Sequence, residues 1–323
     1  MKVLNIRHNM VSKRIWAFQA QIRLPAMRTR SPRRLLRLYP AWLPYMLLIP
    51  ALSVLSLGLF AFLIAIYFAM TNFRLIMPSY QFVGLQNFLI LLHDHGFRAA
   101  LWRTFWFTGA LLAVQLPLGM GIALLLQQIR VGVAIWRTFL IIPLTLPPII
   151  SGLMWKTMLA PYGPVNYLLR PFGFTDLAWL GNQNTALIAI FFIELWISLP
   201  FVVLVLLAGL QALPAEPFEA AAIDGAGPWP MFRYITLPLL RPYIYLVLIF
   251  RFIDNLKIFD TIMSTTRGGP GTSTQLIQVF IYDEAFKNKN LAIALAGILI
   301  VWLLTWIVTQ LMFRKWFNLE NNK

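Results

Sequence analysis

The sequence contains no cysteine and few charged residues. Only 12% of its 323 residues are charged, whereas soluble domains usually carry about 25%. The absence of cysteine excludes a disulfide framework, thiol chemistry and any cysteine-ligated metal. Acidic residues are rarest near the start, because residues 1–43 hold ten Lys or Arg and the first acidic residue is Asp94. Charge is therefore scarce along the chain, and the positive charge is concentrated at one end.

The sequence also lacks the motifs of nucleotide binding and catalysis. No Gly-x-x-x-x-Gly-Lys-[Ser/Thr] phosphate cradle occurs, and the glycine-rich run 268–273 has no lysine, which favours a turn. His93 and His95 flank Asp94, but two histidines in a loop make a poor metal site, so a solvated loop is favoured. No Ser-His-Asp arrangement is evident. We therefore expect no catalysis and no cofactor or metal in this chain.

Long apolar runs make up most of the chain, and hydrophobic residues account for 59% of it. About 20 consecutive apolar residues are enough for a helix to cross a membrane. The runs predict an all-α membrane protein with six spans, at about residues 43–70, 101–126, 138–159, 185–210, 243–263 and 291–313. They divide the chain into a basic arm (1–40), a transmembrane domain (41–316) that contains a polar loop at 214–242, and a tail (317–323).

The third run contains Pro143, Pro147 and Pro148. A proline inside a helix removes a hydrogen bond and clashes with the preceding turn, so we expect this span to be kinked or broken. Backbone groups freed by a break are tolerated at membrane depth when they are buried against other helices or line a cavity. Between the spans, we expect residues 71–100, 161–184 and 265–290 to form connecting loops.

Six spans place both ends of the chain on the same side of the membrane. Because cytoplasmic segments are enriched in Lys and Arg, the basic arm predicts that both termini are cytoplasmic. The arm can lie on anionic lipid as an interfacial helix or remain disordered, and nucleic-acid binding is disfavoured. The same topology places the 214–242 loop in the cytoplasm.

The 214–242 loop is a polar, turn-rich segment between two apolar runs. Pro217 suits the first turn of a helix, and Glu219 would then lie near the positive end of that helix. Three alanines favour the helix, and Gly225 suits a left-handed residue that ends it. A second short helix should follow, which we expect Pro238 to end. The expected structure is two short helices joined by a tight turn, with a small-residue face that another protein can approach closely.

The spacing of residues in this loop matches a long family motif. The matching residues are Glu219, Ala220, Ala221, Asp224, Gly225, Ala226, Phe232, Ile235, Pro238 and Pro242. They resemble the EAA loop of binding-protein-dependent ABC importer permeases, in which the loop is the cytoplasmic coupling helix that docks on the ATPase subunit. The predicted cytoplasmic position fits this motif. An ordinary helical hairpin is the alternative, and a DNA-reading helix-turn-helix is disfavoured between two membrane spans.

The resemblance covers about residues 40–316 and implies a type I importer permease core of six transmembrane helices in a bacterial inner (plasma) membrane. It implies a second permease as heterodimer partner, two copies of an ATPase that binds ATP and Mg, and an extracytoplasmic solute-binding protein. ATP hydrolysis is then expected in the ATPase subunit and not in this chain. The residues implied for ATPase coupling are Glu219, Ala220, Ala221, Asp224, Gly225, Ala226, Phe232 and Pro238.

The fifth run is unusually polar for a membrane span. Charged side chains recur every three residues, at Arg251, Asp254, Lys257 and Asp260. Residues at this spacing are neighbours on a helix, so charges of alternate sign can pair along one face. Ionisable groups at membrane depth are costly unless they are paired or hydrated, which makes each of them a candidate functional residue.

Four polar side chains are candidates for the substrate path, where they would hydrogen-bond substrate hydroxyls: Glu194, Asp254, Asn255 and Asp260. The alternative for the fifth run is a self-satisfied ladder that holds the helix against its partner subunit, since buried ion pairs are often structural. The alternative for Glu194 is an ion pair with Lys156 on the third span.

Two further segments indicate the substrate class. The run 250–260, followed by Arg267-Gly-Gly-Pro270, resembles the sugar-transporting branch of the family, the maltose- and trehalose-type first permease, although Thr-Thr-Arg stands where Leu-Thr is common. Residues 82–88 resemble the segment that precedes the core helices in that branch. The resemblance implies import of a sugar, polyol or glycoside by alternating access. Alternatives are a glycerol-3-phosphate permease, a gradient-driven secondary transporter, which would not need the EAA loop, and a membrane scaffold without solute flux.

Overall fold

The computed structural model describes residues 42–77, 79–129, 132–174 and 177–320, so the predicted basic arm lies outside the described residues. The chain forms two compact units, Met1–Phe62 and Leu63–Lys323. The described part of the first unit is the greater part of helix α3 (Leu43–Ala69), whose side chains from Tyr45 to Ala61 are exposed. Within this unit the helix therefore has no protein core of its own.

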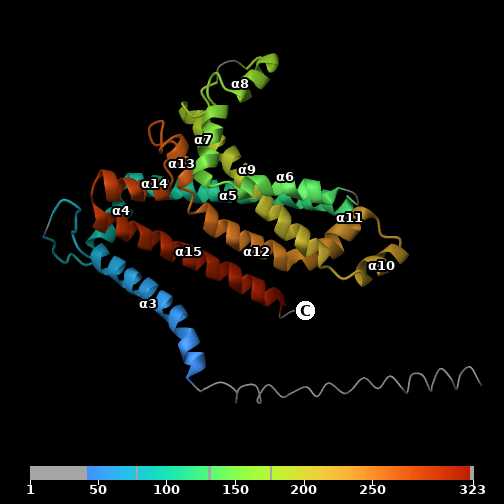
Figure 1. Ribbon diagram of the computed structural model, residues 1–323, viewed down its shortest axis with the longest axis horizontal. Coiled ribbons are helices and arrows are strands. Elements are labelled where there is room, and N and C mark those ends of the chain that lie inside the picture. The colour runs from blue at the N-terminus through green and yellow to red at the C-terminus, as the bar shows by residue number, and fades with distance from the viewer. Residues whose placement is uncertain (1–41, 78, 130–131, 175–176, 321–323) are drawn as a thin grey trace, which may run out of the picture. The chain divides into compact units, whose positions relative to one another are not determined.

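The second unit is built from helices (Figure 1). After the end of α3, its α-helices are α4 (Gln86–His93), α5 (His95–Gln128), α6 (Val133–Thr145), α7 (Pro148–Met158), α8 (Pro164–Leu169), α9 (Gln183–Gln211), α10 (Glu216–Ile223), α11 (Pro228–Met231), α12 (Leu237–Asn255), α13 (Asp260–Thr265), α14 (Ile277–Tyr282) and α15 (Leu291–Glu320). A 3-10 turn (Arg170–Phe172) and two π-helical segments, Phe232–Thr236 and Asp283–Lys287, complete it.

Five helices of the described chain are long and apolar enough to cross a membrane, and the bent pair α6–α7 makes a sixth crossing if it counts as one span. This confirms the predicted all-α membrane fold. The bend between α6 and α7 is 98°, at the break that contains Pro147, as the prolines of the third run predict. Proline can start α7 because its missing N–H has no partner in a first turn.

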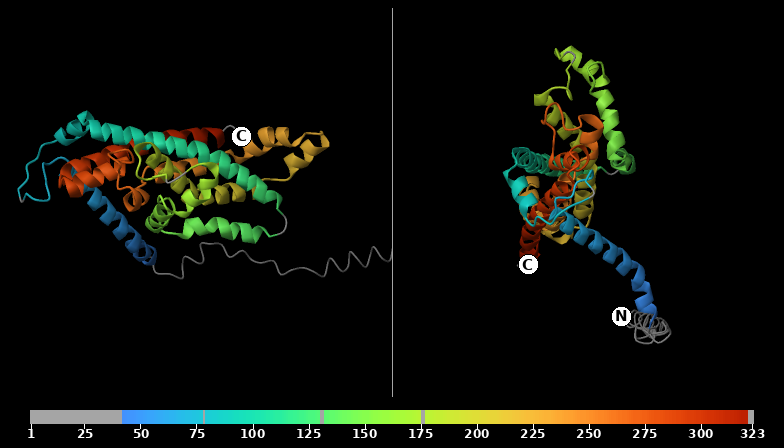
Figure 2. Two further views of the ribbon diagram at one scale, coloured as in Figure 1. Left: turned by 90° about the horizontal axis from the view of Figure 1, so that it is seen from above. Right: turned by 90° about the vertical axis from the view of Figure 1, so that its left-hand side faces the viewer.

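The core of the second unit lies between α5, α9 and α12, which run alongside one another in Figures 1 and 2. Glycine allows these helices to approach closely. A Cβ added at Gly119 would clash with Val202, and one added at Gly209 would clash with the ring of Tyr243. Small residues at helix contacts are typical of membrane bundles, where close backbone packing replaces the hydrophobic effect as the source of association.

The two ends of the second unit differ in structure. At one end, α4, the start of α5, α14 and the start of α15 share one hydrophobic cluster. At the opposite end, α10 and α11 extend beyond the bundle (Figures 1 and 2). The predicted topology makes the first end extracytoplasmic and the second cytoplasmic.

Residues 82–88 tie the end of α3 to α4. Asn87 donates hydrogen bonds from Nδ2 to the carbonyl oxygens of Ala69 (2.8 Å) and Thr71 (2.6 Å). The backbone N–H groups of Val83 and Gly84 both donate to Met70 O. These bonds satisfy carbonyls that the end of a helix leaves without partners. The motif that resembles sugar permeases is thus a cap for the first long helix.

Several predicted loops and boundaries differ from the structure. The expected loop 265–290 contains α14, because Leu276–Tyr282 is an apolar run long enough for a short buried helix. The expected loops 71–100 and 161–184 contain α4 and α8. Helix α15 continues to Glu320, into the predicted tail, since no proline or glycine follows Gly297. Polarity alone thus failed to separate loops from short helices.

Candidate functional site

Helix α10 presents the predicted coupling motif with no buried residue. Pro217 lies in its first turn, as predicted, and Glu219 follows in the same turn. A carboxylate there interacts favourably with the positive end of the helix dipole. Ala220 and Ala222 are exposed, so the small-residue face is available to another protein.

The turn after α10 has the predicted left-handed residue. Gly225 has φ +74°, a conformation that side-chain-bearing residues rarely adopt. The N–H of Gly225 donates to Ala222 O and the N–H of Ala226 donates to Ala221 O, which closes the helix end. Asp224 is the last residue before the turn and is exposed. A Cβ on Gly225 would meet no atom within 4 Å, so the backbone angle, and not space, requires glycine.

The prediction that Pro238 ends the second helix is wrong. The chain continues as one helical rod from Pro228 to Asn255, with Pro238 near the start of α12. The turn before it is π-helical, from Phe232 to Thr236. A wider turn moves the preceding carbonyl away from the proline ring, which removes the clash that would otherwise break the helix. The second half of the coupling motif, from Pro228, is therefore continuous with the membrane helix that follows it.

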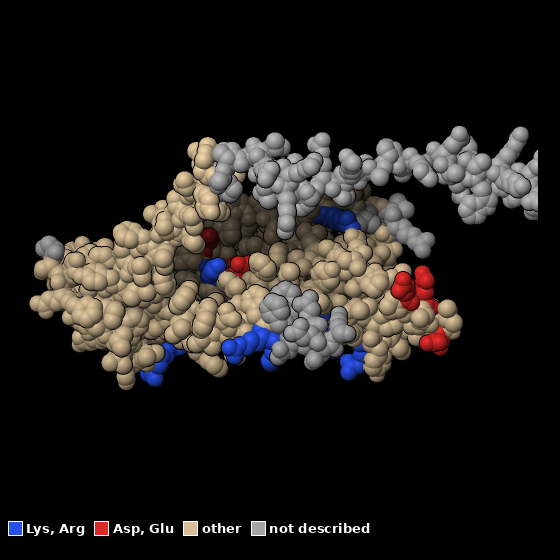
Figure 3. Space-filling model, turned by 90° about the horizontal axis from the view of Figure 1, so that it is seen from below, with Lys and Arg blue, Asp and Glu red and all other residues tan. Residues whose placement is uncertain are grey.

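The surface around α10 and α11 is both acidic and apolar. Acidic side chains gather at this end of the molecule, on the right in Figure 3, where Glu216, Glu219 and Asp224 are exposed. Ile223 is 88% exposed and Trp229, which packs near Phe232 with ring centroids 5.7 Å apart, is 67% exposed. Large exposed apolar side chains beside charged groups are typical of a protein interface.

A second site lies where two helix breaks meet, at the α6–α7 bend and between α12 and α13. The breaks and α9 enclose a cavity of about 200 Å³. Its lining residues are Leu144, Pro148, Glu194, Ile197, Ser198, Arg251, Asp254, Lys257, Ile258, Phe259, Asp260 and Thr261. Figure 3 shows acidic and basic side chains close together within a hollow of the surface. The structure thus brings Glu194, Asp254 and Asp260 to one cavity, although they come from three helices.

Arg251 organises one wall of this cavity. Its Nη1 lies 3.4 Å from Asp254 Oδ2, and its Nη2 donates a 2.7 Å hydrogen bond to Asn255 Oδ1. Asn255 is fully buried and is not among the residues that line the cavity. The structure therefore places Asn255 behind the wall, where it holds the guanidinium, and places Asp254 at the surface of the cavity.

The alternative of a self-satisfied charge ladder along one continuous helix does not fit the structure. Helix α12 ends at Asn255, and Asp260 begins α13 after a four-residue break. Of the four charges, Arg251 and Asp254 form the one ion pair in this part of the described chain. The break contains no proline or glycine and is held by burial of Leu256 and Ile258, which the sequence pattern did not reveal.

Glu194 is buried in the cavity wall, and no ion pair with Lys156 forms among the described residues. Lys156 is exposed on α7, about two turns after the proline that lines the cavity. This finding removes the Lys156 pairing as an explanation for Glu194. The carboxylate instead shares the cavity with Arg251 and Asp260.

Sequence reasoning missed a polar pair beside Glu194. Gln115 on α5 donates a 2.6 Å hydrogen bond from Nε2 to Ser198 Oγ, and both residues are buried. Ser198 also lines the cavity, as does Thr261. The signal was present, because Gln115 interrupts a long apolar run, but a single uncharged amide has no obvious partner in the sequence alone.

Comparison with known proteins gives the same family as the loop motif. Residues 115–314 match the family model described as binding-protein-dependent transport system inner membrane component. These residues include both the α10 loop and the charged cavity.

Relatives in several organisms are similar over most of their length. The chain is 36% identical over 249 residues to the trehalose/maltose transport system permease protein MalF of Thermococcus litoralis. The aligned residues cover 75% of this chain and 83% of that protein. It is 30% identical over 283 residues to the sn-glycerol-3-phosphate transport system permease protein UgpA of Escherichia coli. The aligned residues cover 84% of this chain and 93% of that protein.

A solved structure shares the fold. A chain of a bacterial ABC transporter involved in the import of the acidic polysaccharide alginate superposes with a TM-score of 0.76 at 22% identity, covering 86% of this chain and 96% of that one. At this identity the likeness supports the fold alone. The family match and the relatives together show that this chain belongs to the inner membrane permease components of binding-protein-dependent ABC importers.

Proposed function

We propose that this chain is a permease subunit of an ATP-driven importer of a neutral carbohydrate, and that α10 couples it to a separate ATPase subunit. The observation that carries the coupling role is α10 itself, a helix with no buried residue, followed by the left-handed turn at Gly225. A short helix with no buried residue gains little from this chain's own core, so a partner surface explains why the helix forms there. ATP and Mg bind the ATPase, and this chain supplies no nucleotide site.

The mechanical link between coupling loop and cavity is the helical rod Pro228–Asn255. Its 28 residues correspond to about 42 Å at 1.5 Å per residue. One end adjoins the Gly225 turn, and the other bears Arg251 and Asp254 in the cavity wall. Closure of an ATPase dimer would move the rod as a unit and change access to the cavity. In this arrangement α10 and both chain termini are cytoplasmic.

The cavity is proposed as part of the substrate path. Glu194, Asp254 and Asp260 supply acceptors for sugar hydroxyls, while Asn255 acts indirectly by holding Arg251. A cavity of about 200 Å³ is smaller than the ~300–1,000 Å³ of most ligand pockets. The size supports a site completed by a second permease subunit, which makes the working unit a heterodimer. An extracytoplasmic solute-binding protein would deliver the substrate.

The charge of the cavity favours a neutral substrate over glycerol-3-phosphate. Three carboxylates, Glu194, Asp254 and Asp260, face two cations, Arg251 and Lys257, so the net charge is −1 when all five are ionised. A phosphate ester would add negative charge to a site that already has an excess of it, which is unfavourable in a low-dielectric environment. A neutral sugar, polyol or glycoside meets no such repulsion.

The test is uptake by the complete complex in proteoliposomes. We expect ATP-dependent uptake of a labelled neutral disaccharide or polyol that needs the solute-binding protein and persists without an ion gradient. Uptake of glycerol-3-phosphate with higher efficiency would overturn the neutral-substrate assignment. Uptake that follows an ion gradient and ignores ATP would overturn the ATP-driven mechanism.

A further inference from the structure

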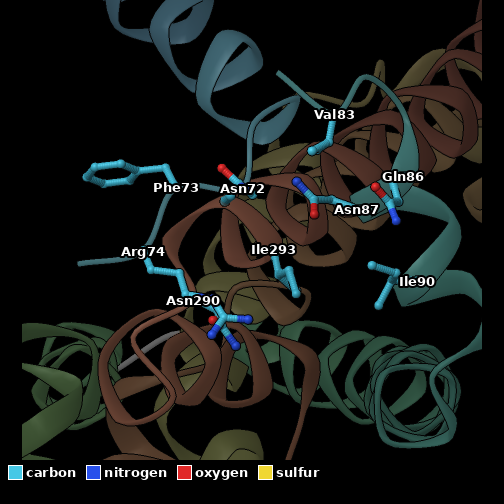
Figure 4. A pocket seen from close by; sticks show the side chains of 10 residues that line it. Asn72, Phe73, Arg74, Val83, Gln86, Asn87, Ile90, Asn290 and Ile293 are labelled. Atoms are coloured by element: carbon cyan, nitrogen blue, oxygen red, sulfur yellow. The ribbon is translucent and has the colours of Figure 1, made fainter. Parts of the chain in front are cut away.

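A second polar cavity (Figure 4) is lined by segments at the end of the bundle opposite α10 (Figure 1). It measures about 220 Å³, and its lining residues are Asn72, Phe73, Arg74, Val83, Gln86, Asn87, Ile90, Asn290, Ala292 and Ile293. The lining comes from the segment after α3, from α4 and from the start of α15. These segments are joined by backbone hydrogen bonds, since Leu75 N donates to Lys289 O and Ala292 N donates to Phe73 O. The cavity is therefore a fixed feature of this end.

The cavity contains one cation and several side-chain amides. Arg74 contributes a guanidinium, and no hydrogen bond or ion pair of its side chain occurs among the described residues. The side-chain amides of Asn72, Gln86 and Asn290 line the same cavity, and amide groups carry two donors each. No carboxylate lines the cavity. A guanidinium among amides matches the geometry and charge of a carboxylate.

The rest of this end has more unmatched positive than negative charge. Asp94 accepts from Phe97 N, Asp283 pairs with Lys287 at 2.7 Å, and Glu284 accepts from Asn288 Nδ2. Each described acid here is thus engaged within the chain. Near the cavity, neither Arg74 nor Lys289 has an anionic partner among the described residues. The surface is complementary to an acidic partner.

Exposed apolar side chains lie beside the cavity in the segment 72–85. Ile76 is 66% exposed, Met77 52% and Phe82 65%. Apolar anchors around a charged pocket form the usual arrangement of a protein interface, in which apolar contact supplies affinity and charge supplies orientation.

We propose that this cavity receives an acidic side chain of the extracytoplasmic solute-binding protein, with Arg74 as the anchoring cation. The inference rests on the proposed function, because it assigns a docking contact to the partner named there. A cavity of about 220 Å³ with a guanidinium in its lining fits one inserted carboxylate side chain. A protein is the favoured occupant because the exposed side chains of Ile76, Met77 and Phe82 extend the contact surface beyond the pocket.

The experiment uses the complete complex in nanodiscs and measures ATPase activity against the concentration of purified, substrate-loaded binding protein. Arg74→Glu should raise the half-saturating concentration of binding protein about tenfold or more, because it puts two carboxylates together in one pocket. Arg98→Glu is the matched control, since Arg98 is exposed at the same end outside the cavity, and should shift it less than about twofold. The difference should shrink at high salt, where charge contacts are screened.

A second variant protects the test against misfolding. Gln86→Trp keeps Arg74 but fills part of the cavity from an exposed helix position, and should also raise the half-saturating concentration. Equal shifts for Arg74→Glu and Arg98→Glu, with Gln86→Trp like the wild type, overturn the docking pocket. Arg74-dependent binding of glucuronate in the absence of binding protein also overturns it, because the pocket would then be a small-molecule site. A wild-type complex that the binding protein never stimulates overturns the proposed function itself.

Discussion

The α10 loop and the charged cavity, which we propose to serve coupling and transport, are encoded in the sequence in different ways. The loop is local, because the residues that start its helix, end it and form its turn all lie within Pro217–Ala226. The cavity is assembled from α6, α7, α9, α12 and α13, whose lining residues are spread over more than a hundred positions of the sequence. Local hydrogen bonds define the first region, and packing between distant segments defines the second.

This difference explains what substitutions should do. A change in the loop alters one backbone angle or one exposed side chain and leaves the bundle intact, so coupling should fail while the chain still folds. A change at the cavity alters either the charge balance or the contact between helices. A change of charge should therefore affect transport, and a change of helix contact should affect the stability of the fold.

Gly225→Val should reduce transport more than any other substitution proposed here. A small effect would contradict the local encoding of the α10 loop. A β-branched residue at φ +74° costs at least about 1–2 kcal/mol and should turn the docking helix away from its orientation. We expect ATP-dependent uptake in proteoliposomes to fall to background, with normal amounts of the chain in the membrane.

Two controls identify the cause of that loss. Gly225→Asn should keep most activity, because asparagine tolerates the left-handed region. Gly227→Ala should be neutral, since Gly227 has φ −72° and an added Cβ would meet only Pro230 Cδ, at 3.9 Å. Full activity of Gly225→Val would remove the turn from the coupling mechanism.

Asp254→Ala should have an intermediate effect on transport and tests the role of the cavity in the substrate path. The side chain of Asp254 is 53% exposed, and its loss leaves Arg251 paired only through Asn255. We expect the substrate concentration for half-maximal uptake to rise about tenfold, equivalent to ~1.4 kcal/mol, while the ATPase still co-purifies. Unchanged uptake would show that Asp254 has no part in the substrate path, and Asp254→Asn separates loss of charge from loss of a hydrogen-bond acceptor.

Gly152→Ala should have the smallest effect on transport and tests the non-local assembly of the cavity. An added Cβ would clash with Ser264 Oγ on α13 and would also lie close to the backbone of Thr261, so Ser264 must rotate or α7 and α13 must separate. Overpacking of this kind costs about 1–3 kcal/mol and should lower the thermal midpoint of the purified complex. Gly121→Ala is the control, because an added Cβ there meets nothing within 4 Å. Equal thermal midpoints for both variants would argue against close packing of α7 on α13.

The sequence predicted the loop well because its physics is short-range. Proline at a helix start, alanines within it and glycine at a left-handed turn are each recognisable without any partner. The failure at Pro238 has a specific cause. A proline breaks an ordinary helix, and the π-helical turn Phe232–Thr236 that accommodates it has no clear signature in the sequence.

The cavity was only partly predictable. Charge at membrane depth marked Glu194, Asp254 and Asp260 as candidates, and the structure brings these three together. The pattern of charges did not predict the break after Asn255, because that break depends on burial of Leu256. The sequence also gave no reason to join Gln115 to Ser198, because pairing across helices depends on their rotation and spacing.

The measurement that tests the central claim most directly is purification of this chain from native membranes in mild detergent, with identification of its partners by mass spectrometry. We expect the wild-type chain to co-purify with a Walker-motif ATPase and with a second six-span permease. The ATPase should be lost with Glu219→Lys and retained with the neighbouring control Glu216→Lys, which makes the same charge change in the same first turn. Recovery of the chain alone or as a homo-oligomer, with no ATPase, would contradict the coupling role of α10.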